Sequence, residues 1–129
     1  MEELIKNVIA WAEGRGIYEK STAEKQYELY LEETAEFYEA LKSGNRDDII
    51  MEYGDRVVTM INHFTIWFEG EPIQKIYNSV IDFFYIGGEY NLRSYNNFTI
   101  EQALEAAYNK ISSRAGKMVD GKFSKQEDL

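Results

Sequence analysis

Hydrophobic residues recur three and four positions apart along most of the chain, which is the spacing of one face of an α-helix. This spacing marks residues 2–13, 21–42, 47–68, 72–85 and 98–114. The short stretches between these segments contain glycine, which favours turns. The pattern therefore predicts an all-α fold, a bundle of about four to five helices.

Residues with strong preferences for helix ends set the expected boundaries. Gly14 is expected to end the first helix. Ser21 with Glu24, and Thr99 with Gln102, have the spacing of a capping box, in which two side chains satisfy free backbone N–H groups. The sequence "SGNRDD" supplies the turn between the second and third helices, so these two helices are expected to form an antiparallel hairpin.

The remaining segments lack helical spacing. "GGEYNLRSYNN" predicts a loop with a short extended piece at Tyr90–Tyr95, and the tail after residue 114 is expected to be loosely held. The chain of 129 residues has no internal repeat, and its 44% hydrophobic residues are enough for one core. We expect a single domain over residues 1–129.

Charge and cysteine content limit the partners. The net charge of −9 argues against binding to a DNA or RNA polymer, since phosphate contacts along a nucleic acid need a basic surface. The first residues are acidic and amphipathic rather than signal-like, and no apolar run is long enough to span a membrane. A chain without cysteine fits a reducing, cytoplasmic setting.

Two glutamates lie on the apolar face of the second predicted helix. On a helical wheel, Glu33 and Glu36 of "EETAEFYEAL" project close to Leu29, Phe37 and Ala40. Carboxylates at positions that should face the core need a specific partner.

The third predicted helix carries a matching polar line on an otherwise apolar surface. The members of this line are Asp48, Glu52, Asp55, Thr59 and Asn62. Glu52 and Asp55 follow the turn by about as many residues as the two glutamates precede it. In an antiparallel hairpin the two acidic pairs therefore lie at the same height.

Four converging carboxylates need compensating charge. Two like charges about 5 Å apart repel by roughly 3 kcal/mol at an effective dielectric constant near 20. These stretches place no lysine or arginine on the same faces. A set of oxygen ligands suits hard divalent cations, above all Mg2+, with Mn2+ as a substitute. The alternative is a pair of ordinary solvated acidic faces.

The acidic residues also match a family signature. "EETAE" is followed by "EYGD", with fifteen residues between Glu36 and Glu52. This order resembles the EExxE…ExxD signature of the MazG-like, all-α nucleoside triphosphate pyrophosphatases. The resemblance extends to "GDRVVTMIN" and to "LEAAYNKISSRAGKMVDGKF", which is similar to the phage and bacterial single-domain members. Residues 69–96 are the least familiar part.

The resemblance implies a reaction and a set of ligands. Glu33, Glu36, Glu52 and Asp55 would bind Mg2+, and Glu32 would orient a water molecule. The substrate would be a nucleoside or deoxynucleoside triphosphate, cleaved to the monophosphate and pyrophosphate. Such a reaction removes unwanted nucleotides from the pool.

Two cations and two amides are candidate substrate ligands. Lys110 and Arg114 lie one turn apart on the last helix, and the resemblance implies that they contact the triphosphate. The alternative is a surface pair near a helix C-terminus. Asn62 and Gln26, on the acidic side of their helices, are candidates for binding the base or sugar. Lys117 and Lys122 in the tail could also reach phosphate, but a solvated tail is the favoured interpretation.

Aromatic residues have further expected roles. Trp11 and Trp67 are candidates for stacking on a base, although aromatic residues at helical spacing usually belong to the core. His63, the only histidine, is expected to be an interior residue rather than a general base. The helix over 72–85, with its aromatic run at 83–85, is expected to form a contact surface of a homo-oligomer, a dimer or tetramer, as the resemblance also implies.

Two other functions stay open. A non-enzymatic acidic helical interaction protein, antitoxin-like or mimicking DNA, would spread its carboxylates over an exposed face and be indifferent to Mg2+. An enzyme would gather them in a cleft. Within enzymes, phosphoribosyl-ATP pyrophosphatase shares the fold and the acidic signature of the family.

Overall fold

The computed structural model describes residues 1–86, 97–114 and 116–125. The helices are α1 (Glu2–Gly14), α2 (Ile17–Lys20), α3 (Ala23–Ser43), α4 (Arg46–Trp67), α5 (Ile73–Ile86) and α7 (Ile100–Ser112), and the strands are β1 (Gly116–Val119) and β2 (Lys122–Lys125). The predicted all-α class is confirmed, with a small β hairpin added. None of the helices in the described ranges is both long and apolar enough to cross a membrane. The extended piece predicted at 90–95 lies outside the described residues.

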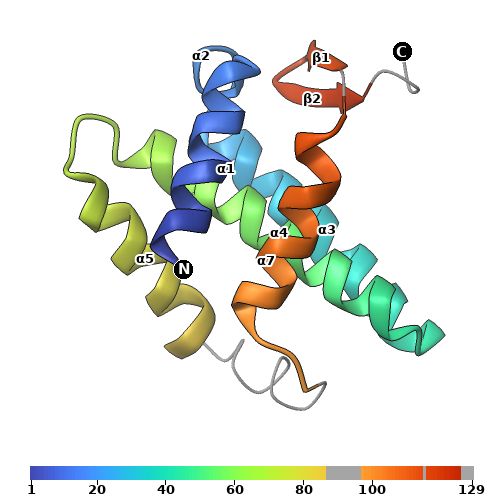
Figure 1. The fold of residues 1–129 in the computed structure, drawn as a ribbon. Helices are drawn as coiled ribbons and strands as arrows, with labels where there is room; N and C mark the ends of the chain where they lie inside the picture. The colour runs from blue at the N-terminus through green and yellow to red at the C-terminus, as the bar shows by residue number, and fades with distance from the viewer. Residues whose placement is uncertain (87–96, 115, 126–129) are drawn as a thin grey trace.

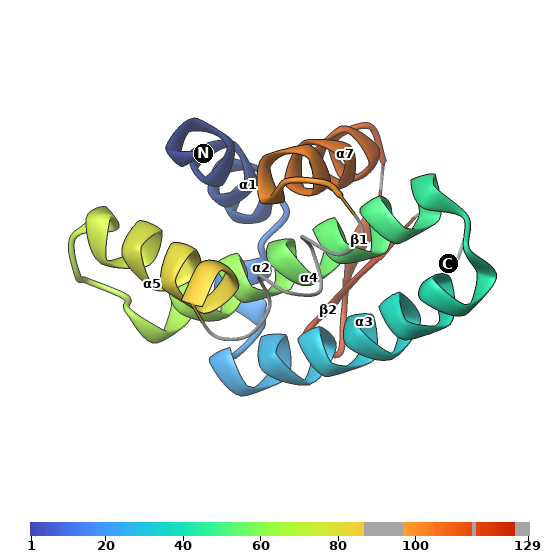
Figure 2. The same cartoon turned by 90° about the horizontal axis from the view of Figure 1, so that it is seen from below.

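Helix α4 runs through the middle of the molecule, and the other helices pack around it (Figure 1). Figure 2 shows α3 on one side of α4, α1 and α7 on the opposite side, and α5 beside its C-terminal half. Because it is surrounded, α4 buries residues on several faces, namely Ile49, Tyr53, Val57, Val58, Met60 and Ile61. This central position explains why its sequence is apolar almost all round.

The turn between α3 and α4 fixes how the two helices align. Gly44 adopts the left-handed conformation (φ 73°), which glycine tolerates without strain, and its N–H donates to the Ala40 carbonyl. Asn45 then caps α4 by accepting a hydrogen bond from the Asp48 N–H at 3.1 Å. The chain therefore reverses within two residues, and the predicted antiparallel hairpin is confirmed.

A buried arginine ties α3 to α4. The Arg56 side chain is 1% exposed, and its guanidinium lies 5.1 Å from the ring centres of Tyr30 and Phe37. Its Nε donates to Thr34 Oγ1 at 3.0 Å and its Nη2 to the Tyr30 hydroxyl at 2.8 Å. Arg56 is the exception to the apolar surface predicted for this helix. Because Thr34 and Arg56 directly follow Glu33 and Asp55, this contact also sets the alignment of the acidic residues.

Helix α7 approaches α4 at Gly54. A Cβ atom built on Gly54 would lie 1.9 Å from the carbonyl oxygen of Ala103 and 2.8 Å from the Cβ of Ala107. Only glycine allows this approach. The contact brings the side of α7 that carries Lys110, one turn beyond Ala107, against the acidic part of α4.

The residues predicted to mark helix ends are confirmed in part. Gly14 is the last residue of α1, as expected, and the left-handed residue Gly16 (φ 76°) follows two positions later. The cap of α3 is Thr22 rather than Ser21, because the Thr22 hydroxyl accepts from the Lys25 N–H. The capping box of Thr99 is confirmed at the start of α7.

Two further predictions concern α5 and the tail. In the aromatic run of α5, Phe84 is fully buried, and Phe83 and Tyr85 pack partly buried against the core. Much of this run is therefore used within the molecule, and a contact with a second copy through α5 stays a prediction. The tail is not loosely held over 116–125, where β1 and β2 form an antiparallel hairpin.

The hairpin turn had a readable sequence signal. Asp120 (φ 51°) and Gly121 (φ 80°) connect the paired residues Val119 and Lys122, as in a two-residue type I′ turn. An Asp-Gly pair between hydrophobic residues is among the strongest short-range signals for a β hairpin. In "KMVDGKF" this signal is present.

The close approach at Gly54 predicts that Gly54→Ala is destabilising. The added methyl must push α7 away, and overpacking of this kind costs about 1–3 kcal/mol, or more where backbone is the obstacle. Gly14→Ala is the matched control, since a Cβ there meets no atom within 4 Å. Denaturant unfolding should show a lower midpoint for Gly54→Ala and an unchanged or higher one for Gly14→Ala. Equal midpoints for the two variants would contradict the packing described.

Candidate metal centre

Three carboxylates meet between α3 and α4. Glu33 and Glu36 project from one face of α3, and Glu52 projects toward them from α4. Each offers a carboxylate oxygen that lies within 4.8 Å of the other two. The structure thus brings together residues that the hairpin spacing placed at the same height.

Two buried oxygens of the carboxylate cluster have no hydrogen-bond partner. Glu33 Oε2 and Glu52 Oε2 are buried and have no hydrogen-bond partner. Burial, together with the charges of Asp55 and Glu36, raises the pKa of Glu33 to about 8. The same causes raise the pKa of Glu52 to about 7. The site therefore favours protons or another cation at these oxygens.

Asp55 lies beside the cluster and is paired with Lys110 of α7. The Lys110 Nζ donates to both carboxylate oxygens, at 2.8 and 2.6 Å. Burial raises the pKa of Asp55, and the positive charge of Lys110 acts against this rise. The predicted fourth metal ligand and the predicted phosphate ligand are thus in contact with each other. The cation that pairs with Asp55 therefore comes from α7 rather than from the helical hairpin of α3 and α4.

The cluster and Asp55 line one wall of a cleft of about 710 Å³. Positive charges line the same cleft. They come from α3, from α7 and the residues just after it, and from the β hairpin, and they are Lys25, Lys110, Arg114 and Lys122. A cleft with adjacent carboxylates and cations suits a ligand that itself combines metal ions with phosphates. The predicted acids of α3 and α4 and the predicted cations Lys110 and Arg114 thus line the same cleft.

A smaller pocket of about 170 Å³ adjoins the cleft and shares Glu33, Asp55 and Lys110 with it. Its walls include the two predicted amides, Gln26 and Asn62, which are both buried.

The two amides of the side pocket are oriented by neighbours. The Tyr18 hydroxyl donates to Asn62 Oδ1 at 2.8 Å, and Gln26 Nε2 donates to Ser21 Oγ at 3.0 Å. In this arrangement the Asn62 NH2 group and the Gln26 carbonyl oxygen are the atoms left for a ligand. Trp11 also lines this pocket, and its stacking on a base stays a prediction.

Three predicted residues lie elsewhere. Glu32 is exposed and pairs with Lys122 at 3.7 Å, outside the carboxylate cluster. Trp67 is 62% exposed, stacks on His63, and is not among the residues that line the cleft or the side pocket. His63 Nδ1 lies 2.7 Å from the Ala23 carbonyl oxygen and must donate to it, because a carbonyl only accepts.

The ligand atoms of the cluster fit a hard divalent cation. All donors are carboxylate oxygens, which suit Mg2+ and Mn2+ better than softer metals. The two buried oxygens without hydrogen-bond partners are available for coordination. Residues within the described ranges therefore meet the requirements for such an ion.

Comparison with known proteins gives one relative. Over 61 residues the chain is 36% identical to an uncharacterised 18.2 kDa protein of Haemophilus phage HP1 (strain HP1c1), from the rep-hol intergenic region. The match covers 47% of this chain and 37% of that protein, so it spans little more than a third of the relative's length. No protein-family model matches the chain. No solved structure matches it.

The raised pKa values predict a pH-dependent stability in the presence of a chelator. The folded protein keeps protons on Glu33 and Glu52 that the unfolded chain releases near its ordinary pKa of 4.5. The free energy of unfolding should therefore fall as the pH rises from about 5 to about 8. Mg2+ should oppose this loss, because it replaces the protons.

Thermal unfolding with EDTA and with Mg2+ tests this dependence. Glu33→Gln should flatten the fall in melting temperature with pH and remove most of the gain from Mg2+. Glu39→Gln is the control, since Glu39 is an exposed acid of the same helix, paired with Lys42. A melting temperature that rises with pH in EDTA would refute the assignment of raised pKa values.

Proposed function

We propose that this protein is a Mg2+-dependent nucleoside triphosphate pyrophosphohydrolase. It would convert an NTP or dNTP and water to the monophosphate and pyrophosphate, in cytoplasmic nucleotide-pool housekeeping. The observation that carries the proposal is the carboxylate cluster with unpartnered buried oxygens, set in a cleft that also carries four cations. The resemblance to the MazG-like enzymes supplies the type of reaction.

The location of the acids favours an enzyme over an acidic interaction protein. A DNA mimic or antitoxin-like protein needs its carboxylates spread over an exposed surface. Here Glu33, Glu52 and Asp55 are partly buried and Glu36 is exposed, and the two glutamates of α3 meet Glu52 of α4 across the helical hairpin. Keeping repelling groups in a cleft is a cost that a surface mimic would avoid. Phosphoribosyl-ATP pyrophosphatase remains the alternative substrate specificity.

The chain's residues have distinct proposed roles. Glu33, Glu36 and Glu52 would hold the ion, with Asp55 as a further oxygen donor on the same wall. When bound, Mg2+ would neutralise phosphate charge and make a bound water more acidic. Lys110 would shield the charge of Asp55. Lys110 and Arg114 would together bind phosphate oxygens through their positive charges.

The sizes of the two cavities suit the two parts of a nucleotide. Pockets for whole drug-sized ligands are typically about 300–1,000 Å³. The side pocket of about 170 Å³ is too small for a whole nucleotide and suits one ring system. The adjoining cleft of about 710 Å³ has room for a phosphate chain and metal ions. Asn62 and Gln26 would then contact the base or sugar.

We further propose a homo-oligomer, a dimer or tetramer, with a second copy covering the outer side of α3. This helix exposes Tyr27, Leu31 and Tyr38, which are spaced to form one stripe. His63 contacts both Tyr27 and Trp67, so the stripe continues onto α4.

The proposed interface predicts an effect of Leu31→Glu. A buried charge without a partner in the contact should lower the oligomer's stability and release monomers at micromolar concentration. Light scattering of the wild type and the variant measures this. Glu24→Gln, an exposed change on the same helix, is the control. A monomeric wild-type protein would contradict the proposal.

The proposed reaction predicts the effect of changing the cluster. Outer partners of metal ligands typically contribute 10–100-fold to activity, so loss of a direct ligand in Glu52→Gln should lower turnover by about 100-fold or more. Helical circular dichroism should stay the same. Asp48→Asn is the matched control, because Asp48 is an exposed acid of the same helix and does not line the cleft.

The assay is a panel of nucleoside triphosphates with Mg2+, analysed for monophosphate and pyrophosphate. Release of single orthophosphates would mean a different reaction. Full activity of the Glu52→Gln variant would contradict a role of the carboxylate cluster in the reaction.

A further inference from the structure

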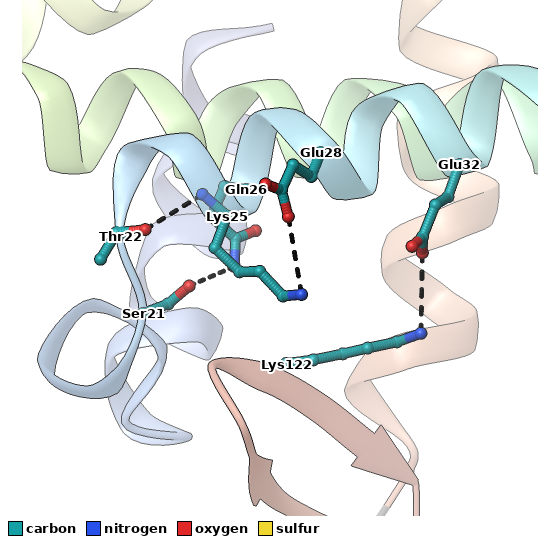
Figure 3. A network of polar contacts seen from close by, with 7 residues as sticks. All are labelled: Ser21, Thr22, Lys25, Gln26, Glu28, Glu32 and Lys122. Atoms are coloured by element: carbon teal, nitrogen blue, oxygen red, sulfur yellow. Dashed lines mark hydrogen bonds and ion pairs between the residues drawn. The ribbon is translucent and has the colours of Figure 1, made fainter.

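The β hairpin forms one side of the metal cleft. Its residues Val119, Asp120, Lys122 and Ser124 line the cleft together with the carboxylates. Figure 3 shows the hairpin below the N-terminal half of α3, with the Lys122 side chain extended toward Glu32.

The turn of the β hairpin lies beside the start of α3. A Cβ atom on Gly121 would lie 3.4 Å from Lys25 Cγ and 3.7 Å from the Lys20 carbonyl oxygen. The turn thus lies next to the junction between α2 and α3, close to the stem of Lys25, which also lines the cleft. Lys25 and Lys122 therefore belong to one wall.

The four cations of the cleft differ in how firmly they are engaged. Lys110 and Asp55 are 22% and 16% exposed and in close contact at 2.6 Å. Lys122 and Glu32 are 53% and 59% exposed, and their charged atoms are 3.7 Å apart. Lys25 and Glu28 are also 3.7 Å apart and more exposed than the Lys110 pair. Long, exposed ion pairs contribute little, so these two lysines can change partner at small cost.

We infer that Lys25 and Lys122 form a second phosphate-binding pair, separate from Lys110 and Arg114. Its ligand is the part of a polyphosphate chain that extends beyond the carboxylate cluster. Two ammonium groups on the hairpin side of the cleft match the charge of such a chain. The inference rests on the proposed function, because it assumes that the chain enters this cleft with Mg2+.

The second pair gives the site a means to select by chain length. A single phosphate bound at the cluster leaves the hairpin side of the cleft without a ligand. A chain of three phosphates can contact both sides. Lys122 also lines the side pocket, so its charge lies near the junction of the two cavities.

Calorimetric titration of inorganic tripolyphosphate with Mg2+ tests the inference without any catalysis. Lys122→Met and Lys25→Met should each weaken tripolyphosphate binding by about 10-fold, the effect of losing one charge-assisted hydrogen bond. Binding of orthophosphate should change much less. Lys42→Met is the matched control, because Lys42 forms the same kind of exposed ion pair on α3, with Glu39, away from the cleft.

A second variant should act in the opposite direction. Glu32→Gln removes the carboxylate that competes for Lys122, so tripolyphosphate should bind more tightly. If the Lys122–Glu32 pair had only a structural role, Lys122→Met and Glu32→Gln would weaken tripolyphosphate binding to the same extent. That result, or unchanged binding in Lys122→Met, would overturn the inference, as would a wild-type protein that does not bind tripolyphosphate.

The outcome is separable from that of the proposed function. Lysine-dependent binding of tripolyphosphate, without hydrolysis of any nucleoside triphosphate, would refute the reaction and leave the second phosphate pair in place. Hydrolysis of a nucleoside triphosphate, together with tripolyphosphate binding that depends on neither Lys25 nor Lys122, would support the reaction and refute the second phosphate pair.

Discussion

Electrostatic repulsion among three carboxylates is the constraint around which this molecule is built. Glu33, Glu36 and Glu52 have oxygens within 4.8 Å of one another, and two of these residues carry buried oxygens without hydrogen-bond partners. Left to itself, such a set would push α3 and α4 apart. The two-residue turn after α3 and the buried Arg56, which binds groups of α3, hold the helices together. A divalent cation would turn this repulsion into attraction.

The acidic hairpin could be predicted from the sequence because its geometry is local. A helix has a fixed rise per residue, so equal distances from one turn give equal heights for Glu33 and Glu52. Capping at Thr99 and the side-pocket position of Asn62 follow from equally short-range patterns. These parts of the fold and site depend on spacing within one helix or across one turn.

Other parts of the site depend on contacts between distant segments. The pairing of Lys110 with Asp55 needs the close approach of α7 to Gly54, which helical spacing does not reveal. Arg56 is buried among aromatic rings of both helices, Tyr53 of α4 and Tyr30 and Phe37 of α3, and the sequence of α4 shows only the first of them. The β hairpin is different, because its Asp-Gly turn is a local sequence signal for a β hairpin. Because the sequence favours a solvated tail, Lys122 ranks below Lys110 and Arg114 as a predicted phosphate ligand.

The central claim is that the carboxylate cluster binds a divalent metal ion together with a nucleoside triphosphate. Anomalous scattering from crystals grown with Mn2+ and a non-hydrolysable nucleoside triphosphate analogue tests it most directly. The account predicts an anomalous peak coordinated by oxygens of Glu33, Glu36 and Glu52, with the phosphates in the same cleft. A cluster without a peak, or Mn2+ bound only at other surface glutamates such as Glu69 and Glu71, would contradict it.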